Sequence, residues 1–231
     1  MALNKNKMLQ TKRKLVTQHN PKSPISEQYK TIRTNIQFSS VDQEMQTILV
    51  TSSGPGEGKS TTVANLAVVF AQAGKRVLLV DGDLRKPTVH YTFSFTNTFG
   101  LTNVLTRQKE FEEVVKVSEV ENLDILTSGP IPPNPAELLG SKSMDELIRT
   151  VRGMYDIIIF DTPPVLAVTD SQILANISDG VILVVSSGRT ENEMAVKAKE
   201  LLEGVNAKMV GVVLNNKDIK ESSYYYYYGK K

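Results

Sequence analysis

The sequence predicts an α/β fold with a mostly parallel sheet and helices on both faces. Short apolar runs rich in valine, isoleucine and leucine recur along the 231-residue chain. Segments with helical spacing of apolar residues separate them. Because these runs are continuously apolar rather than alternating, they indicate strands that are buried on both faces. The expected strands cover 47–50, 77–80, 123–126, 157–160, 181–185 and 209–214.

The expected helices and tails divide the chain into three parts. Residues 1–23 are basic and end among prolines, so we expect a flexible arm; the alternative is contact with anionic lipid or an acidic partner. Residues 24–214 form one domain, and residues 215–231 are a polar tail. Helices are expected at 26–38, 59–73, 141–152 and 191–203, with two short ones in 101–117, a stiff proline-rich connection at 128–135, and a capping box at Ser143 and Glu146.

The composition excludes several classes of protein. A net charge of +2 does not by itself predict a nucleic-acid partner, and none is expected. The absence of cysteine excludes disulfides, cysteine-ligated metals and cysteine nucleophiles. No apolar run approaches the roughly 20 residues that a membrane span needs, and the polar N-terminus lacks a signal-peptide core. We therefore expect a cytoplasmic protein that reaches the inner face of the plasma membrane only through a partner.

A glycine-rich loop at 53–61 lies between an expected strand and an expected helix. This context is typical of a P-loop, in which backbone N–H groups and a helix N-terminus bind phosphate. Lys59 would bridge the β- and γ-phosphates, and the Ser60 hydroxyl would bind Mg²⁺. Ser53 replaces the usual first glycine. The loop predicts a P-loop NTPase-like fold, with nucleotide contacts from Gly54, Gly56, Glu57, Gly58, Lys59, Ser60 and Thr61.

Three aspartates follow buried strands, where open α/β sheets bind ligands. Asp161 has the position of a Walker B acid that binds Mg²⁺; the alternative is a cap on the following turn. Asp81 and Asp83 follow another strand. A tyrosine hydroxyl has a pKa of about 10, so a carboxylate that orients it and accepts its proton assists transfer. We expect Asp81 in that role and Asp83 as a magnesium ligand; either acid could instead form a turn.

The tail contains an uninterrupted run of five tyrosines: Tyr224, Tyr225, Tyr226, Tyr227 and Tyr228. Five consecutive aromatic side chains cannot all face one core, and these lie beyond the last expected strand. We interpret them as phosphoryl acceptors, although a low-complexity tract of no function is the alternative. Each phosphate would add about −1.5 to −2 charges. An ATP-dependent tyrosine kinase that modifies its own tail would account for both the loop and the tyrosines.

Asn215, at the end of the last expected strand, is a candidate for contact with the adenine amino group. The following residues, 216–218, are similar to the guanine-reading N-K-x-D motif but lack its spacer residue. We therefore expect ATP, with Mg²⁺, rather than GTP.

These motifs together resemble the bacterial protein-tyrosine kinases of capsule and exopolysaccharide synthesis, the BY-kinases. The resemblance extends from about residue 21 to the tail. Its carriers are T-S-S-G-P-G-E-G-K-S-T at 51–61, V-D-G-D-L-R-K-P at 80–87, S-G-P-I-P-P-N-P-A-E-L-L at 128–139, I-I-I-F-D-T-P-P at 157–164 and the tyrosine run. The Ser53 departure is usual in that family. The resemblance implies catalytic and Mg·ATP roles for Lys59, Ser60, Asp81, Asp83 and Asp161.

The resemblance also implies partners. The family has an E-x-x-R-x-x-R element that packs subunits into a ring, and this chain has Glu27, Lys30 and Arg33 at those positions. Lysine lacks the planar fork of arginine, and an ion-pair series within one helix is the alternative. The chain is similar to the split form of the family, in which a membrane-anchored activator completes the site. Substrates are expected among sugar-nucleotide and polysaccharide enzymes.

Two other functions fit a P-loop. A partitioning ATPase of the deviant-Walker class would carry the loop K-G-G-x-G-K-[ST], but Gly54 occupies the position of the signature lysine. A small-molecule kinase would need an arginine-rich lid, which the sequence does not show, and would leave the tyrosine run unexplained.

Overall fold

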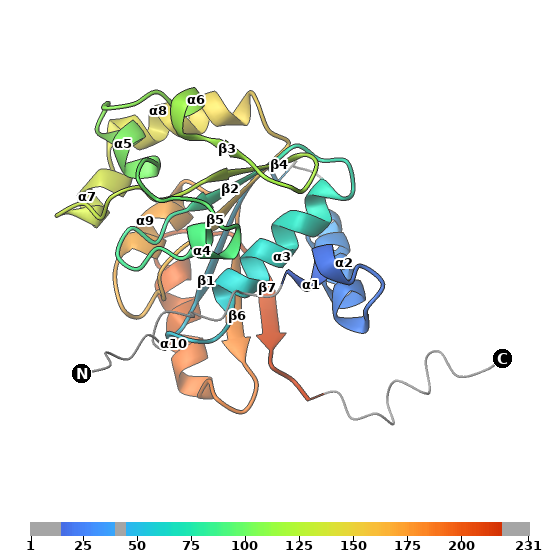
Figure 1. Cartoon of the computed structure of the whole chain (residues 1–231). Coiled ribbons are helices and arrows are strands. Elements are labelled where there is room, and N and C mark those ends of the chain that lie inside the picture. The colour runs from blue at the N-terminus through green and yellow to red at the C-terminus, as the bar shows by residue number, and fades with distance from the viewer. Residues whose placement is uncertain (1–14, 40–44, 219–231) are drawn as a thin grey trace, which may run out of the picture.

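The computed structural model describes residues 15–39 and 45–218, and within them a seven-stranded sheet lies at the centre of the molecule (Figure 1). The strand order is β3-β4-β2-β5-β1-β6-β7, and every pairing is parallel except β3 with β4. The strands are β1 Thr47–Ser52, β2 Val77–Asp81, β3 Lys116–Val117, β4 Leu123–Leu126, β5 Ile157–Asp161, β6 Gly180–Ser186 and β7 Met209–Asn215. The predicted α/β class and its six strands are confirmed; β3 was not predicted.

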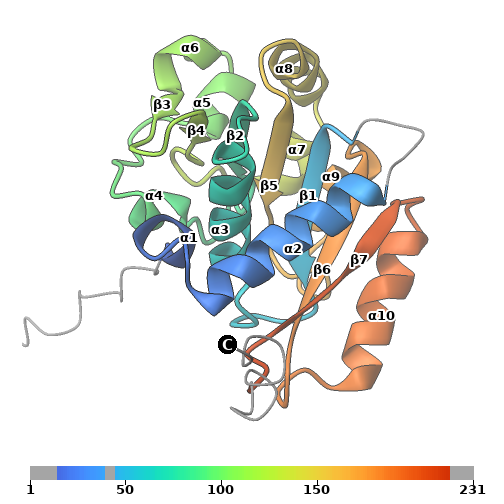
Figure 2. The ribbon, with the colours of Figure 1, turned by 90° about the vertical axis from the view of Figure 1, so that its right-hand side faces the viewer.

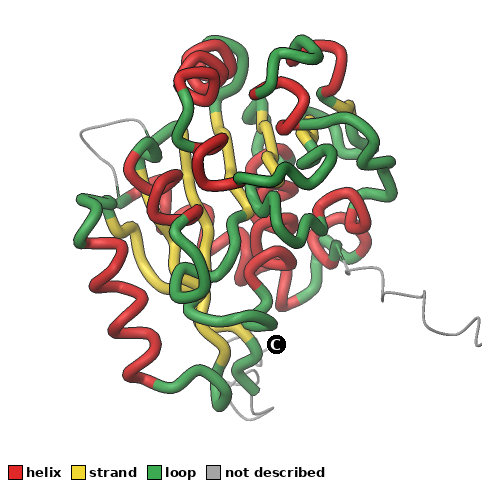
Figure 3. The backbone as a smooth tube through the Cα atoms, turned by 90° about the vertical axis from the view of Figure 1, so that its left-hand side faces the viewer, coloured by secondary structure: helices red, strands yellow, loops and turns green. Residues whose placement is uncertain are grey.

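Helices cover both faces of the sheet, as predicted. Figure 2 shows α1, α2 and α3 in front of the strands, and the opposite view in Figure 3 shows helices over the other face. The helices are α1 Val16–His19, α2 Pro24–Phe38, α3 Lys59–Ala71, α4 Val89–Thr92, α5 Leu101–Leu105, α6 Phe111–Val114, α7 Pro135–Leu139, α8 Lys142–Arg152, α9 Asp170–Asn176 and α10 Asn192–Glu203. None of the helices in the described ranges is long and apolar enough to span a bilayer.

The core consists of two apolar clusters, one on each face of the sheet. In β1, Leu49 packs with the cluster that includes α8 and α10, whereas Ile48 and Val50 pack with the cluster that includes α3. All three side chains are fully buried. Successive residues of a strand point to opposite faces, so a run without polar residues is what two covered faces require.

The start of the described chain differs from the prediction. The flexible arm was expected to extend through residue 23, but residues 16–19 form α1, which packs on α3. Leu15 and Thr17 are buried. The backbone N–H and hydroxyl of Thr17 donate to Asn65 Oδ1 at 3.1 and 2.9 Å, and Gln72 Nε2 donates to the Thr17 carbonyl. The prediction is therefore wrong for 15–23; residues 1–14 lie outside the described part.

A serine precedes both α2 and α8. Ser23 caps α2, because its hydroxyl accepts a hydrogen bond from the Ser26 N–H at 3.1 Å. The capping box at Ser143 and Glu146 is wrong, because the residue that precedes α8 is Ser141, two residues earlier, and Ser143 lies inside the helix. Glu146 instead pairs with Arg107 across the surface at 3.0 Å.

Candidate active site

The glycine-rich loop connects the end of β1 to the start of α3, as predicted. Gly56 and Gly58 have φ values of +77° and +93°, a conformation that residues with a side chain rarely adopt. The loop and Pro164 line a cavity of about 260 Å³. Backbone N–H groups of such a loop and the N-terminus of a 13-residue helix favour an anion. All loop residues that the sequence assigned to nucleotide contacts, except Gly54, line this cavity.

The Glu57 side chain hydrogen-bonds both to the loop itself and to the segment that follows β6. Its Oε1 accepts hydrogen bonds from the hydroxyls of Ser53 and Thr190, both at 2.7 Å, and its side chain is buried. Arg189 donates to the Gly56 carbonyl at 3.3 Å. Thr190 and Arg189 were not predicted, because a threonine and an arginine in a connecting loop carry no motif.

Lys59 lies among the carboxylates that the sequence selected. Its Nζ is 3.6 Å from Asp161 Oδ1, 3.9 Å from Asp83 Oδ2 and 3.3 Å from the Ser60 hydroxyl. β1, β2 and β5 lie side by side in the order β2-β5-β1, so their carboxyl ends bring these groups together. The predicted site is thus assembled from three separate strand ends.

Asp81 is completely buried. Its Oδ2 accepts hydrogen bonds from the N–H groups of Thr88 and Val89 at 3.0 and 2.9 Å. Burial, and next the charge of Asp161, raise the pKa of Asp81 to about 8. Asp81 therefore has a higher affinity for a proton than an ordinary carboxylate.

Asp83 lies nearer the surface, with a side-chain exposure of 9% against none for Asp161. Its Oδ1 accepts hydrogen bonds from the N–H groups of Arg85 and Lys86, at 3.3 and 2.9 Å, so that Oδ2 faces Lys59. Asp83 is thus more accessible than Asp81, the last residue of β2, to a substrate outside the sheet.

The buried oxygens fit a magnesium–nucleotide complex. Asp81 Oδ1 and both carboxylate oxygens of Asp161 make no hydrogen bond within the described part of the chain, and a buried carboxylate oxygen without a partner is costly. No group of three or more His, Cys, Asp or Glu side chains among the described residues forms a metal site unaided. Mg²⁺ would therefore share its ligands between Ser60, Asp83, Asp161 and phosphate oxygens.

Asn215 lies against the loop at the end of β7. Its Nδ2 donates to the Glu57 carbonyl at 3.0 Å. A Cβ added at Gly58 would lie 1.9 Å from that nitrogen. The edge of the nucleotide loop is therefore within reach of this amide, while its contact with adenine stays a prediction.

Two other predicted elements lie away from these acids. Glu27 and Lys30 form an exposed ion pair at 2.8 Å within α2, as the intrahelical alternative supposed. Arg33 Nη1 instead donates to the Val69 carbonyl in the last turn of α3 at 2.9 Å. The ring contact stays a prediction. Tyr224 to Tyr228 lie outside the described residues.

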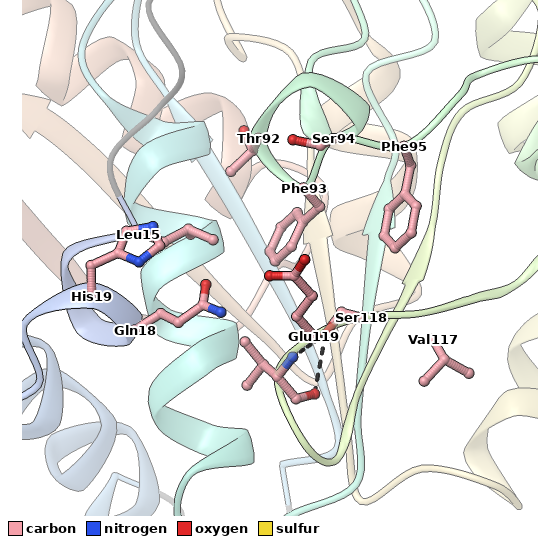
Figure 4. Close-up of a pocket in the computed structure, with 11 residues that line it drawn as sticks. Leu15, Gln18, His19, Thr92, Phe93, Ser94, Phe95, Val117, Ser118 and Glu119 are labelled. Carbon is pink, nitrogen blue, oxygen red and sulfur yellow. Dashed lines mark hydrogen bonds between the residues drawn. The ribbon is translucent and has the colours of Figure 1, made fainter.

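A second cavity, of about 200 Å³, lies between α1 and the segments 92–95 and 117–120. Figure 4 shows the Glu119 side chain directed between Gln18 and Phe93. None of the residues that line this cavity belongs to the loop or to the three aspartates.

Comparisons with known proteins decide the family. A family model described as an AAA domain matches residues 45–210. The tyrosine-protein kinase YwqD of Bacillus subtilis (strain 168) is 57% identical over 231 residues, covering 100% of this chain and 98% of that protein. The putative tyrosine-protein kinase CapB of Staphylococcus aureus is 44% identical, covering 91% and 92%. The chain belongs to the bacterial tyrosine-kinase family.

A solved structure of this family has the same fold. The crystal structure of the chimerical protein CapA2B2 aligns with a TM-score of 0.86 and 46% identity, covering 89% of this chain and 90% of that one. Family membership confirms the resemblance inferred from the motifs. It also favours the kinase interpretation over a partitioning ATPase or a small-molecule kinase, because the relatives named above are tyrosine kinases.

Proposed function

We propose that this bacterial tyrosine kinase transfers the γ-phosphoryl group of Mg·ATP to tyrosine hydroxyls, including those of its own tail, and thereby regulates capsular or exopolysaccharide synthesis. One observation supports this most strongly. Asp83 and Asp161 each place a carboxylate oxygen within 3.9 Å of Lys59 Nζ beside the phosphate loop, and Asp81 lies buried beside them.

The residues have separate tasks in the transfer. Loop N–H groups and Lys59 would hold the phosphates, and Ser60, Asp83 and Asp161 would hold Mg²⁺, which would supply positive charge to stabilise the phosphate oxygens. The tyrosine oxygen forms a bond to the γ-phosphorus as the bond to the β–γ bridging oxygen breaks, and ADP leaves. The phenolic proton passes to Asp81, whose raised pKa makes its deprotonated carboxylate a stronger base than an ordinary aspartate.

The decisive experiment is incubation of the full chain with Mg·ATP, with and without an activator segment, followed by phosphosite mapping. Phosphate on Tyr224–Tyr228 should appear and should fall at least 100-fold in Lys59→Met and Asp81→Ala. Lys75→Met, which replaces an exposed lysine beyond α3, is the matched control. Hydrolysis of ATP without any phosphotyrosine would instead support the switch-type ATPase.

The tail gives a second test. We propose that the unphosphorylated tail enters the active site of a neighbouring subunit and helps to hold a ring, and that phosphates release it by charge repulsion. A chain with phenylalanine at 224–228 should incorporate no tail phosphate and should keep its large oligomer in the presence of Mg·ATP, as measured by light scattering. Unchanged incorporation and unchanged oligomer size would contradict the proposal.

The remaining partners belong to the same proposal. A membrane-anchored activator, as in the family's split form, would recruit the chain to the inner face of the plasma membrane. Sugar-nucleotide enzymes would be its protein substrates, and Glu27, Lys30 and Arg33 would contribute to the ring contact. The CapA2B2 chimera supports the pairing, since it joins parts of two proteins in a single structure that resembles this chain.

A further inference from the structure

An ion pair outside the predicted site connects two of its loops. Asp170, the first residue of α9, has a completely buried carboxylate. Arg85 donates to it through Nε at 2.9 Å and through Nη2 at 3.0 Å. Two parallel charge-assisted hydrogen bonds fix orientation as well as distance. The sequence analysis assigned no role to either residue.

Arg85 also holds one of the site's acids. Its backbone N–H donates to Asp83 Oδ1 at 3.3 Å, beside the N–H of Lys86 at 2.9 Å. The residue that reaches α9 with its guanidinium group therefore fixes Asp83 with its main chain. A shift of Arg85 would move the turn that directs Asp83 Oδ2 toward Lys59.

The other end of the pair leads back to Asp161. Ser171, next to Asp170, hydrogen-bonds to the Pro163 carbonyl. Thr162, between Asp161 and Pro163, is held by its hydroxyl on the Val50 carbonyl at 3.0 Å. The start of α9 is thus bonded to the segment that directly follows Asp161.

We propose that Arg85 and Asp170 are positioning residues that set the separation of Asp83 and Asp161 and thereby the divalent-cation site. The inference rests on the function proposed above, in which these two acids hold Mg²⁺. Among the residues that the structure describes, Lys59 is the only cation that pairs with both acids, at 3.9 Å from Asp83 and 3.6 Å from Asp161. The pairing of β2 with β5 and the bond from the Gly82 N–H to the Asp161 carbonyl at 2.8 Å fix the backbone at the strand ends. Lys59 must also hold phosphate, so the Arg85–Asp170 pair is the contact that can fix the loops beyond those ends.

A second ion pair provides a matched control. Arg76 precedes β2 and Asp156 precedes β5, and they form a 2.7 Å bridge. Arg85 and Asp170 lie beyond the opposite ends of the same two strands. Both pairs therefore join the same pair of strands by a two-point arginine–aspartate contact. Only the Arg85–Asp170 pair lies at the end that carries the acids.

The test titrates Mg²⁺ against the full chain at a fixed concentration of a fluorescent ADP analogue. Arg85→Ala should raise the half-saturating Mg²⁺ concentration about 10-fold or more, while affinity for the analogue in EDTA changes less than about twofold. Phosphotransfer should fall mainly in kcat. Added guanidinium should partly restore the Mg²⁺ response, because the Arg85 side chain is 40% exposed. Arg76→Ala should leave the Mg²⁺ response unchanged.

Two milder variants keep the test valid if Arg85→Ala does not fold. Asp170→Asn keeps the volume and one acceptor, and Arg85→Lys keeps the charge without the fork; each should shift the Mg²⁺ requirement in the same direction. The proposal is overturned if these variants respond to Mg²⁺ no differently from Arg76→Ala, or if they lose only thermal stability. If instead the wild-type chain binds Mg·ADP normally but never forms phosphotyrosine, the proposed kinase function fails and the positioning role of Arg85 and Asp170 remains.

Discussion

The buried carboxyl group of Asp81 lowers the stability of the fold. It is one residue of a five-residue strand whose side chains are all buried. A polar group there is costly unless hydrogen-bonded, and two backbone N–H groups bind only one of its oxygens. The remaining oxygen and the raised pKa mark a residue that is maintained at some cost to stability.

This cost predicts a pH dependence. Between its ordinary pKa near 3.8 and about 8 in the folded state, the folded chain holds one more proton at Asp81 than the unfolded chain. The free energy of unfolding must therefore fall as pH rises through this window. Asp81→Asn removes this pH-dependent contribution to the free energy of unfolding. The stability of the variant relative to wild type should therefore grow by up to about 1.4 kcal/mol for each pH unit of increase. Urea unfolding without nucleotide or Mg²⁺ at pH 5.5, 6.5 and 7.5 measures it.

Asp156 supplies the control for that experiment. The pKa of Asp156 is lowered by its hydrogen bonds with Arg76, so its titration lies below the window. Asp156→Asn should shift stability by a constant amount across pH 5.5–7.5. A constant difference for Asp81→Asn as well would contradict the buried-proton account.

At the scale of elements, the apolar pattern was the most reliable guide. Each predicted strand appears, five of them extended by one or two residues and β4 with its predicted bounds, because burial on both faces leaves no other place for an uninterrupted aliphatic run. The short elements α1, α4, α7 and α9 were not predicted. A four-residue helix such as α1 has too few positions to show a period, and tertiary contacts such as Thr17 with Asn65 determine it.

The contact between α2 and α3 leads to a prediction about stability. Arg33 satisfies a carbonyl that the end of α3 leaves without a helical partner, whereas Glu27 makes an exposed pair on the surface. Arg33→Ala should lower the free energy of unfolding by about 1–2 kcal/mol, and Glu27→Ala by only a few tenths. Urea unfolding at concentrations where light scattering shows monomers measures both. Equal losses would show that Arg33 acts through subunit contacts alone.

At the scale of the whole molecule, five strand ends meet around the phosphate loop: those of β1, β2, β5, β6 and β7. Nucleotide binding should therefore stabilise the entire fold. With Mg·ADP at about 100 times its Kd, we expect about 2.7 kcal/mol and a rise in Tm of about 5–10 °C. Differential scanning calorimetry should show most of this rise lost in EDTA and in Asp161→Asn. An equal rise with and without Mg²⁺ would exclude a shared metal site.

The sequence could predict the acids of the site but not the network that supports them. Asp161 and Asp81 end buried strands, which is a recognisable pattern. Asp170 begins a short helix, where an acid is common for reasons of helix polarity alone. Thr190 and Arg85 act through partners 133 and 85 residues away. Only the folded arrangement reveals such pairs.

The close approach of Asn215 to Gly58 has a consequence for how the two positions can change. An alanine at 58 would place its methyl group where the amide of Asn215 lies, at 1.9 Å. A residue larger than glycine at position 58 would then require a smaller residue in place of Asn215 at the end of β7. It would also have to adopt the left-handed backbone conformation of Gly58. The two sites are therefore expected to vary as a pair or not at all.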